Sequence, residues 1–71
     1  MSDRVVVTRL PGGVADVRLN RADKMNALDV PMFEALVATG SELARDPSLR
    51  AVVLSGEGRA FSAGLDFSSF Q

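Results

Sequence analysis

The run Ala51-Val-Val-Leu-Ser55 constrains the fold of this chain more than any other feature of its sequence. Its apolar residues do not alternate with polar ones, and a short run of this kind is typical of a strand inside a sheet that is covered on both faces. The turn-forming residues Gly56-Glu57-Gly58 close it. A fold that contains this strand therefore needs an apolar layer on each side of the sheet.

Two earlier segments predict further strands. Residues 5–10 and 14–19 are rich in β-branched and other apolar side chains, and Pro11-Gly12-Gly13 lies between them. This pattern predicts an antiparallel hairpin. Residues 20–29 are polar and irregular, so we expect a connecting loop there.

A helix is predicted between that loop and the apolar run. Asp29 is a favourable N-cap, and Pro31 falls in the first turn, where its missing N–H costs nothing. The helix should end near Ala44 or Arg45, because Pro47 pushes the residue before it out of the helical region. Apolar residues at helical spacing predict a core face made of Met32, Phe33, Leu36, Val37, Gly40, Leu43 and Ala44.

Strand, helix and strand in this order predict a right-handed crossover with two parallel strands, so the fold class is α/β. The one predicted helix covers one face of the sheet, whereas Val52, Val53 and Leu54 point to both faces. We therefore expect the second layer to come from a continuation of the polypeptide past Gln71 or from another subunit.

Composition excludes several classes of function. Eight basic and nine acidic residues among 71 give a net charge of −1, so there is no basic surface for a nucleic acid or an anionic membrane. The sequence contains neither His nor Cys, which removes an imidazole base, a thiolate nucleophile and a soft-metal site. No apolar run approaches the roughly 18 residues that a membrane span needs, and a cytoplasmic location is expected.

Residues 54–66 have the form of a strand, a glycine-rich loop and a possible helix start. Backbone N–H groups in such a place suit an anion, either a phosphate or the oxyanion of an activated carbonyl. Phe61 stands where a dinucleotide fingerprint needs glycine, and the Gly-Lys-Ser/Thr of a P-loop is absent. The alternative is that these glycines only form turns.

Three blocks of this sequence resemble the N-terminal part of the crotonase, or enoyl-CoA hydratase/isomerase, superfamily. They are LNRADKMNALD at 19–29, LRAVVLSG at 49–56 and GRAFSAGLD at 58–66, in the family's order and approximate separation. The resemblance implies a spiral of repeated ββα units, of which residues 1–71 form the N-terminal ββα unit, one following parallel strand and a loop. It also implies that these residues are only part of one domain.

The resemblance further implies chemistry on acyl-CoA thioesters. In this superfamily two backbone N–H groups bind the thioester oxygen as it becomes an enolate, and the first corresponds here to the N–H of Leu65. Hydration of a trans-2-enoyl-CoA is the favoured reaction, with double-bond isomerisation beside it. The CoA moiety belongs to the substrate, so no separate cofactor or metal is implied. The positions that match the substrate path are Lys24, Met25, Ala27, Ala63, Gly64, Asp66 and Phe67.

Several of these positions have a second interpretation. Asp66 is either a residue that orients substrate or the cap of a helix starting at Phe67, and the strong N-cap preference of Asp favours the cap. Lys24 is either a contact to a CoA phosphate or an ordinary surface cation. Phe61 and Phe67 either line an acyl pocket or pack against the missing layer. Glu57 is expected to be a solvated turn residue.

The second oxyanion donor and the two glutamates that carry out hydration in the superfamily correspond to positions beyond Gln71. We therefore expect the 71-residue chain alone to be inactive. A homotrimer, a hexamer or a complementary C-terminal polypeptide is the expected partner. The rival hypotheses are a non-catalytic remnant that pairs with another chain, and a free-standing CoA-binding module.

Overall fold

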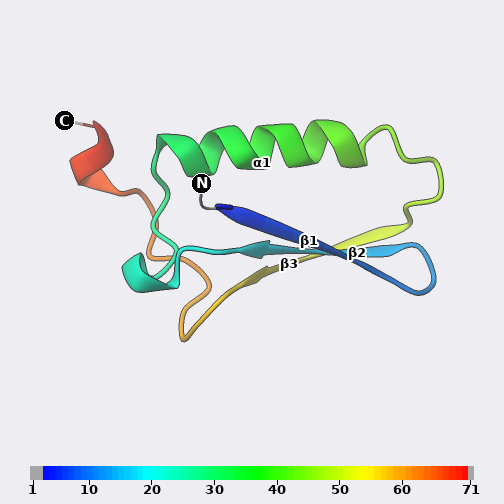
Figure 1. The fold of residues 1–71 in the computed structure, drawn as a ribbon, viewed down its shortest axis with the longest axis horizontal. Helices are drawn as coiled ribbons and strands as arrows, with labels where there is room; N and C mark the ends of the chain where they lie inside the picture. The colour runs from blue at the N-terminus through cyan, green and yellow to red at the C-terminus, as the bar shows by residue number, and fades with distance from the viewer. Residues whose placement is uncertain (1–2, 71) are drawn as a thin grey trace.

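The computed structural model describes residues 3–70, which form a three-stranded sheet with a helix on one face (Figure 1). The sheet order is β1-β2-β3, with β1 and β2 antiparallel and β2 and β3 parallel. The predicted α/β order is confirmed. The elements are β1 (Val5–Leu10), β2 (Val14–Leu19), η1 (Ala22–Lys24), α1 (Val30–Leu43), β3 (Ala51–Gly56) and η2 (Phe67–Phe70).

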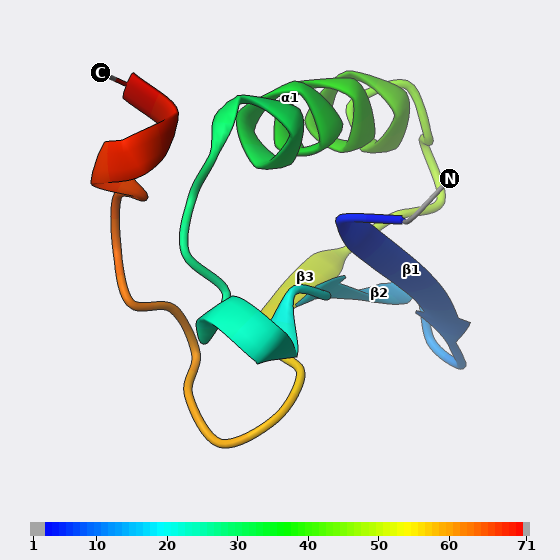
Figure 2. The ribbon, with the colours of Figure 1, turned by 60° about the vertical axis from the view of Figure 1, so that its left-hand side comes forward.

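The register of the sheet sends two loops out of the same edge. In the hairpin, Val5 faces Leu19 across the antiparallel pair. In the parallel pair, Leu19 at the end of β2 lies opposite Gly56 at the end of β3. Because parallel strands end at the same edge, the segments 20–29 and 57–66 leave the sheet side by side (Figure 2).

Local sequence signals explain the bounds of α1. The Asp29 side chain accepts a hydrogen bond from the Met32 N–H at 2.9 Å, and Pro31 lies in the first turn, so the predicted N-cap is confirmed. The helix ends at Leu43, with Ala44 as its C-cap, in close agreement with the predicted end. The predicted loop 20–29 contains one 3-10 turn, η1, which the polar pattern did not indicate.

The buried core is small and lies between α1 and the sheet. Ala15, Val17 and Leu43 are buried, with Val5 and Leu49 partly buried against them. Val52 and Leu54 of β3 lie on the α1 side of the sheet, where they border an open groove beside the helix, and Val53 lies on the opposite face. Within residues 3–70 all three are about half exposed, at 50%, 52% and 48% in that order. The expectation that β3 needs further cover from outside this chain agrees with its partial exposure within residues 3–70, and the source of that cover stays a prediction.

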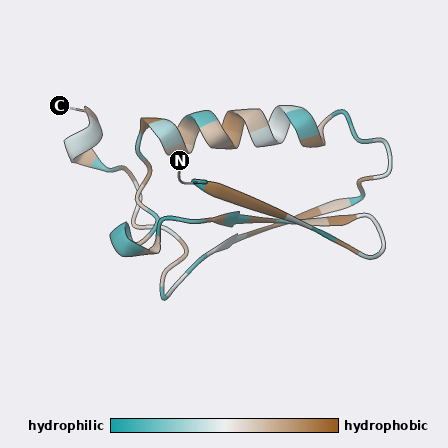
Figure 3. Cartoon of the chain, in the orientation of Figure 1, coloured by the Kyte–Doolittle hydropathy of each residue, from teal (hydrophilic) through white to brown (hydrophobic). Residues whose placement is uncertain are grey.

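The core face of α1 is only partly buried. Met32 is fully buried and Leu36 is partly buried, but Phe33 is 39% and Val37 is 69% exposed, which corrects their predicted core positions. The Phe33 ring contacts the Phe70 ring edge to face, with centroids 6.1 Å apart. Apolar side chains of α1 and the sheet also border an open groove of about 410 Å³, whose lining includes Val17, Leu36, Leu43, Leu49, Val52 and Leu54. Figure 3 shows the apolar residues of β1 and α1 in brown.

The segment after the second loop is shorter than a regular α-helix. Residues 67–70 form the 3-10 turn η2, which lies near the start of α1 (Figure 2). The Asp66 carboxylate accepts hydrogen bonds from the Ser68 N–H at 3.2 Å and the Ser68 hydroxyl at 2.6 Å. The Val30 N–H donates to the Ser69 hydroxyl at 3.3 Å, which connects η2 to α1. Asp66 thus caps η2, in agreement with the favoured interpretation.

Candidate functional site

Asn26 connects the two loops that leave the sheet edge. Its side chain is fully buried, and its backbone has φ +56°, a conformation that Asn tolerates better than most residues. The amide nitrogen donates to the carbonyl oxygens of Glu57 at 2.8 Å and Ala60 at 2.9 Å. The amide oxygen accepts from the Arg21 N–H at 2.7 Å. One side chain therefore fixes the turn at 21–26 and holds it against residues 57–60.

Three backbone hydrogen bonds extend this connection. The Ala63 N–H donates to the Met25 carbonyl at 2.8 Å, the Leu28 N–H donates to the Gly64 carbonyl at 2.8 Å, and the Asp66 N–H donates to the Leu28 carbonyl at 3.0 Å. Together the last two form a single parallel bridge between Leu28 and Leu65. Segment 63–66 therefore runs beside segment 25–28 as a short ladder.

Leu65 is the exception in this ladder. In this parallel bridge Leu28 forms both hydrogen bonds, through its N–H and its C=O. Leu65, the residue opposite, turns its own N–H and C=O away from the partner segment. The N–H groups of Ala63 and Asp66 donate to backbone carbonyls, and that of Gly64 donates to the Ser62 hydroxyl at 3.1 Å. Within residues 3–70 the Leu65 N–H has no hydrogen-bond acceptor. The fold thus holds one backbone donor open between neighbours whose donors are used.

Charged side chains also connect the segments 25–28 and 63–66. Arg21 donates to the Asp66 carboxylate at 2.9 Å and to the Ala27 carbonyl at 3.1 Å, and lies 3.4 Å from the Asp29 carboxylate. Arg4 forms an ion pair with Asp29 at 2.8 Å. Two arginines and two carboxylates therefore alternate along one network, which balances its charge.

The pKa values of the Asp29 and Asp66 carboxyls are both lowered, by different neighbours. The hydrogen bond from Arg4 is the largest cause of the lowered pKa of Asp29, and the Met32 N–H lowers it further. The Ser68 hydroxyl and then Arg21 lower the pKa of Asp66. Both carboxylates are therefore ionised at neutral pH, and neither is suited to act as a general base there.

The structure brings most of the predicted substrate positions together at this edge. Met25, Ala27, Ala63, Gly64 and Asp66 lie in the two paired segments. Lys24 ends η1 with an exposed side chain, and among residues 3–70 its ammonium forms no salt bridge. Phe67 begins η2 and is 77% exposed. Phe61 and Glu57 are exposed in the loop after β3.

Two positioning groups, Arg21 and Asn26, were missed by sequence reasoning. The sequence pattern indicates only that both are polar residues of a connecting loop. The signal that was available is Asn itself, since it is enriched where a non-glycine residue takes a left-handed backbone conformation. Nothing in the sequence marks the partners of either side chain, which lie between 31 and 45 residues away for Glu57, Ala60 and Asp66.

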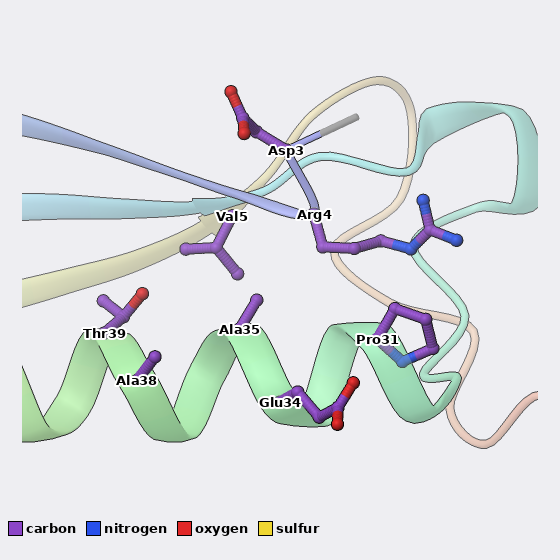
Figure 4. Close-up of a pocket in the computed structure, with 8 residues that line it drawn as sticks. All are labelled: Asp3, Arg4, Val5, Pro31, Glu34, Ala35, Ala38 and Thr39. Carbon is purple, nitrogen blue, oxygen red and sulfur yellow. The ribbon is translucent and has the colours of Figure 1, made fainter. Parts of the chain in front are cut away.

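A separate cleft of about 530 Å³ lies between the start of β1 and α1 and is lined by eight residues (Figure 4). Val5 faces Ala35, Ala38 and Thr39 across it, and these small side chains leave the cleft open. Glu34 is one of the charged groups at its border, together with Arg4. In residues 3–70 no three His, Cys, Asp or Glu side chains come close enough to hold a metal ion, and no helix there is long and apolar enough to cross a membrane.

The sequence was compared with models of known families. The model described as enoyl-CoA hydratase/isomerase matches residues 9–71, which include both loops of the site. The chain belongs to the enoyl-CoA hydratase/isomerase family. The resemblance seen in the sequence is thereby confirmed.

Individual relatives agree with this assignment. The chain is 40% identical over 60 residues to the mitochondrial Delta(3,5)-Delta(2,4)-dienoyl-CoA isomerase of Homo sapiens, covering 84% of this chain and 18% of that protein. It is 31% identical over 67 residues to the hydroxycinnamoyl-CoA hydratase-lyase of Pseudomonas fluorescens, covering 94% of this chain and 24% of that protein. It thus spans about a fifth of the length of the curated relatives that it matches.

Solved structures of family members have the same fold. An enoyl-CoA hydratase of Mycobacterium marinum matches with a TM-score of 0.85 at 39% identity, over 90% of this chain and 32% of that one. A monofunctional enoyl-CoA isomerase of M. smegmatis matches with a TM-score of 0.85 at 38% identity, over 89% of this chain and 30% of that one. The chain therefore has the crotonase-like fold of the N-terminal part of this family: a ββα unit, one following parallel strand and a loop.

Proposed function

We propose that this enoyl-CoA hydratase/isomerase family chain forms part of an acyl-CoA site in which the Leu65 N–H stabilises the thioester oxygen as it becomes an enolate. The observation that carries the proposal is the open Leu65 donor between neighbours whose N–H groups are used. A fixed donor at a developing negative charge needs no reorganisation during the reaction, and it lowers the barrier for that reason.

The carboxylates near the Leu65 N–H have structural contacts and are poorly suited to transfer protons. Asp66 accepts from Arg21 and Ser68, and its pKa is lowered, so it is a poor base. Asp29 is buried as the cap of α1. We infer that the acid and base lie outside these residues, in the rest of one crotonase-like domain or in a complementary chain.

The two paired segments form the proposed path for the substrate. Met25 and Ala63 are joined by a hydrogen bond, so residues from both loops border one surface. An exposed Lys24 on η1 suits a CoA phosphate, which it would meet as a point charge. The proposed substrate positions are Lys24, Met25, Ala27, Ala63, Gly64, Asp66 and Phe67, with Asp66 contributing through its place in the ladder.

Addition of water to a trans-2-enoyl-CoA is the proposed reaction. Isomerisation uses the same enolate stabilisation, and the printed names of the relatives include both hydratases and isomerases. The proposed setting is a cytoplasmic trimer or hexamer, or a complex with a complementary C-terminal polypeptide. CoA enters as part of the substrate, so no separate cofactor is proposed.

A chimera tests the proposal. The 71-residue chain replaces its equivalent in the M. marinum hydratase, and hydration of a trans-2-enoyl-CoA is followed by the loss of the conjugated thioester absorbance. We expect an active chimera, and no turnover by the 71-residue chain alone. A chimera that has the same melting temperature as the recipient hydratase, and is therefore folded, but hydrates no substrate contradicts the proposal.

Leu65→Pro in that chimera removes the donor, and the matched control Leu65→Ala keeps it. Because the Leu65 N–H has no acceptor within residues 3–70, proline breaks no hydrogen bond there. Gly64, with φ +90°, is less restricted than other residues before a proline. We expect proline to lower kcat by about 100- to 1,000-fold and alanine by far less. Equal effects of the two substitutions would remove the support for the donor.

The second candidate function is a non-catalytic chain that pairs with another polypeptide. The half-exposed Val52, Val53 and Leu54 of β3 favour it, because within residues 3–70 these apolar side chains are only partly covered on either face of the strand. Mixing the chain with the C-terminal remainder of the M. marinum hydratase separates the two functions. Stable association without hydration supports the non-catalytic chain, whereas hydration excludes it.

A further inference from the structure

We propose that Arg21 is a positioning residue that sets the direction of the Leu65 N–H. The guanidinium holds segment 63–66 onto segment 25–28 from a place directly after β2. This inference deepens the proposed function and rests on it, because the aim of the donor matters only if the donor meets a substrate oxygen.

One nitrogen of Arg21 reaches both sides of the ladder. Its Nη1 lies 3.1 Å from the Ala27 carbonyl oxygen on the first segment and 2.9 Å from the Asp66 carboxylate on the second. The Asp29 carboxylate lies 3.4 Å from the same nitrogen. The side chains of Arg21 and Asp66 are only 14% and 18% exposed, so water screens this contact less than a surface ion pair. Arg21 therefore joins the two residues that flank the Leu28–Leu65 bridge.

The contact from Arg21 matters because the residue directly before Leu65 is a glycine, whose backbone can rotate more freely than that of other residues. Gly64 precedes Leu65 with φ +90°, and a Cβ added there would meet nothing within 4 Å. Glycine has wide conformational freedom, so rotation at Gly64 can redirect the following N–H. The bridge itself consists of two hydrogen bonds and belongs to no longer strand. Fixing Asp66 on the far side of Leu65 limits this rotation.

The residues before Leu65 are held by hydrogen bonds that do not involve the Arg21 guanidinium. The Ser62 hydroxyl donates to the Asn26 carbonyl at 2.8 Å and accepts from the Gly64 N–H at 3.1 Å. Asn26 is in turn tied to the Arg21 N–H at 2.7 Å. The backbone of Arg21 thus supports the residues before Leu65, and its side chain supports the residue after it.

The test compares Arg21→Gln and Arg21→Lys in the hydratase chimera. Glutamine removes the charge and the reach of the guanidinium, so we expect kcat to fall about tenfold with KM changed less than about twofold, as for a donor that is slightly misplaced. Lysine keeps the charge and is expected to recover part of this loss. The matched control is Arg9→Gln, which removes a 2.7 Å ion pair to Asp46 away from the loops and is expected to leave kcat unchanged.

A second readout does not depend on catalysis. In the 71-residue chain labelled with ¹⁵N-leucine, Arg21→Gln is expected to move the Leu65 amide signal. It is also expected to speed hydrogen exchange at the Leu28 amide, which donates to Gly64, by about tenfold. Arg9→Gln is expected to leave both amides as they are. Asp66→Asn removes the same ion pair from its other end and gives the same readings if Arg21→Gln does not fold.

The outcomes separate the two proposals. If Leu65→Pro remains as active as Leu65→Ala, the proposed function fails whatever Arg21 does. If Leu65→Pro abolishes activity while Arg21→Gln, or Asp66→Asn in its place, leaves kcat and both leucine amides unchanged, only the positioning role of Arg21 fails. A loss of kcat with a displaced Leu65 amide, partly restored by lysine, supports the role.

Discussion

Two regions of this molecule differ in how fully their contacts are satisfied. In the open region, which is the core between α1 and the sheet, several apolar side chains stay exposed, whereas in the closed region, which comprises the loops 20–29 and 57–66, the buried polar side chains have hydrogen-bond partners within residues 3–70. Three residues form the buried core cluster between α1 and the sheet, and Val52, Val53 and Leu54 of β3 stay about half exposed. At the edge where β2 and β3 end, every buried side-chain nitrogen and oxygen within residues 3–70 has a hydrogen-bond partner. Local polar contacts can thus shape the donor at Leu65 before the sheet has its second layer.

This difference follows from how the two kinds of contact act. Hydrophobic stabilisation grows with the apolar area removed from water, so an uncovered sheet contributes little on its uncovered face. A hydrogen bond is satisfied by one correctly placed partner, and leaving a buried polar group without one is costly. Within residues 3–70 the buried polar side chains of the loops have their hydrogen-bond partners, while the apolar side chains of β3 stay about half exposed.

The largest effects on the closed region are expected from substitutions of Asn26, beginning with Asn26→Gly. Glycine accepts φ +56° but removes three hydrogen bonds and leaves the Arg21 N–H and two carbonyls without this partner. We expect a loss of about 3 to 4 kcal/mol, at roughly 1 kcal/mol for each bond with an added desolvation cost. Urea unfolding of the chimera measures it.

Asn26→Asp is the matched comparison for that substitution. It keeps an oxygen for the Arg21 N–H, but it loses both donors and places a buried carboxylate oxygen against the carbonyl oxygens of Glu57 and Ala60, so we expect a loss of stability at least as large as that of glycine. A glycine variant as stable as wild type would show that the two loops are held together by something other than this amide.

Leu43→Ala tests the open region. Leu43 belongs to the core cluster and also borders the open groove beside α1. Because that space is already open to solvent, we expect about 2 kcal/mol in the 71-residue chain, the low end for Leu→Ala in a core. In the chimera, where the recipient supplies further residues, the loss should be larger. Equal losses in both proteins would contradict the idea that the groove is closed by other residues. Thermal or urea unfolding of both provides the comparison.

Regular elements could be predicted from sequence, but the contacts between the loops could not. The two strands, their tight turn, the cap at Asp29 and the parallel strand are encoded by nearby residues, and all are confirmed. Phe33 was misplaced because helical spacing identifies an apolar stripe but not how much of it is covered. The resemblance to a known family, rather than spacing, led to Leu65.

The missed residues show the same limit. Arg21 and Asn26 act on partners that chain folding brings from 31 to 45 residues away, and no local period relates them. Their positions became informative only when the parallel register placed the ends of β2 and β3 together. The open donor at Leu65 likewise depends on which of its neighbours are bonded across the bridge.

Asp29→Asn tests how much of the loss of folding stability at low pH comes from one carboxylate of the closed region. The pKa of Asp29 is lowered in the folded chain, chiefly by Arg4, so its contribution is present above the ordinary value near 3.8 and is lost as the pH falls through the folded value. Asparagine keeps the N-cap but not the charge. We expect the variant to melt lower than wild type at pH 7 and to lose less on acidification below pH 4.

Melting curves of the chimera at pH 7, 5 and 3 measure this dependence. Glu34→Gln is the control, since Glu34 is exposed on α1 and forms no salt bridge within residues 3–70. Parallel acid curves for wild type and Asp29→Asn would mean that the ion pair with Arg4 does not carry the pH dependence.

The smallest effect is expected from Arg9→Gln, although it removes one of the shortest ion pairs of residues 3–70, at 2.7 Å. The Arg9 side chain is 49% exposed and that of Asp46 is 25% exposed, so water and salt screen the pair and the ordered side chains lose entropy. Asp46 also accepts from the Ser48 N–H and hydroxyl, which still hold the turn after α1 when Arg9 is replaced. We expect the melting temperature to change by less than about 2 °C. A fall as large as that of Asp29→Asn at pH 7 would show that ion-pair distance, rather than burial, sets the contribution of charged contacts in this chain.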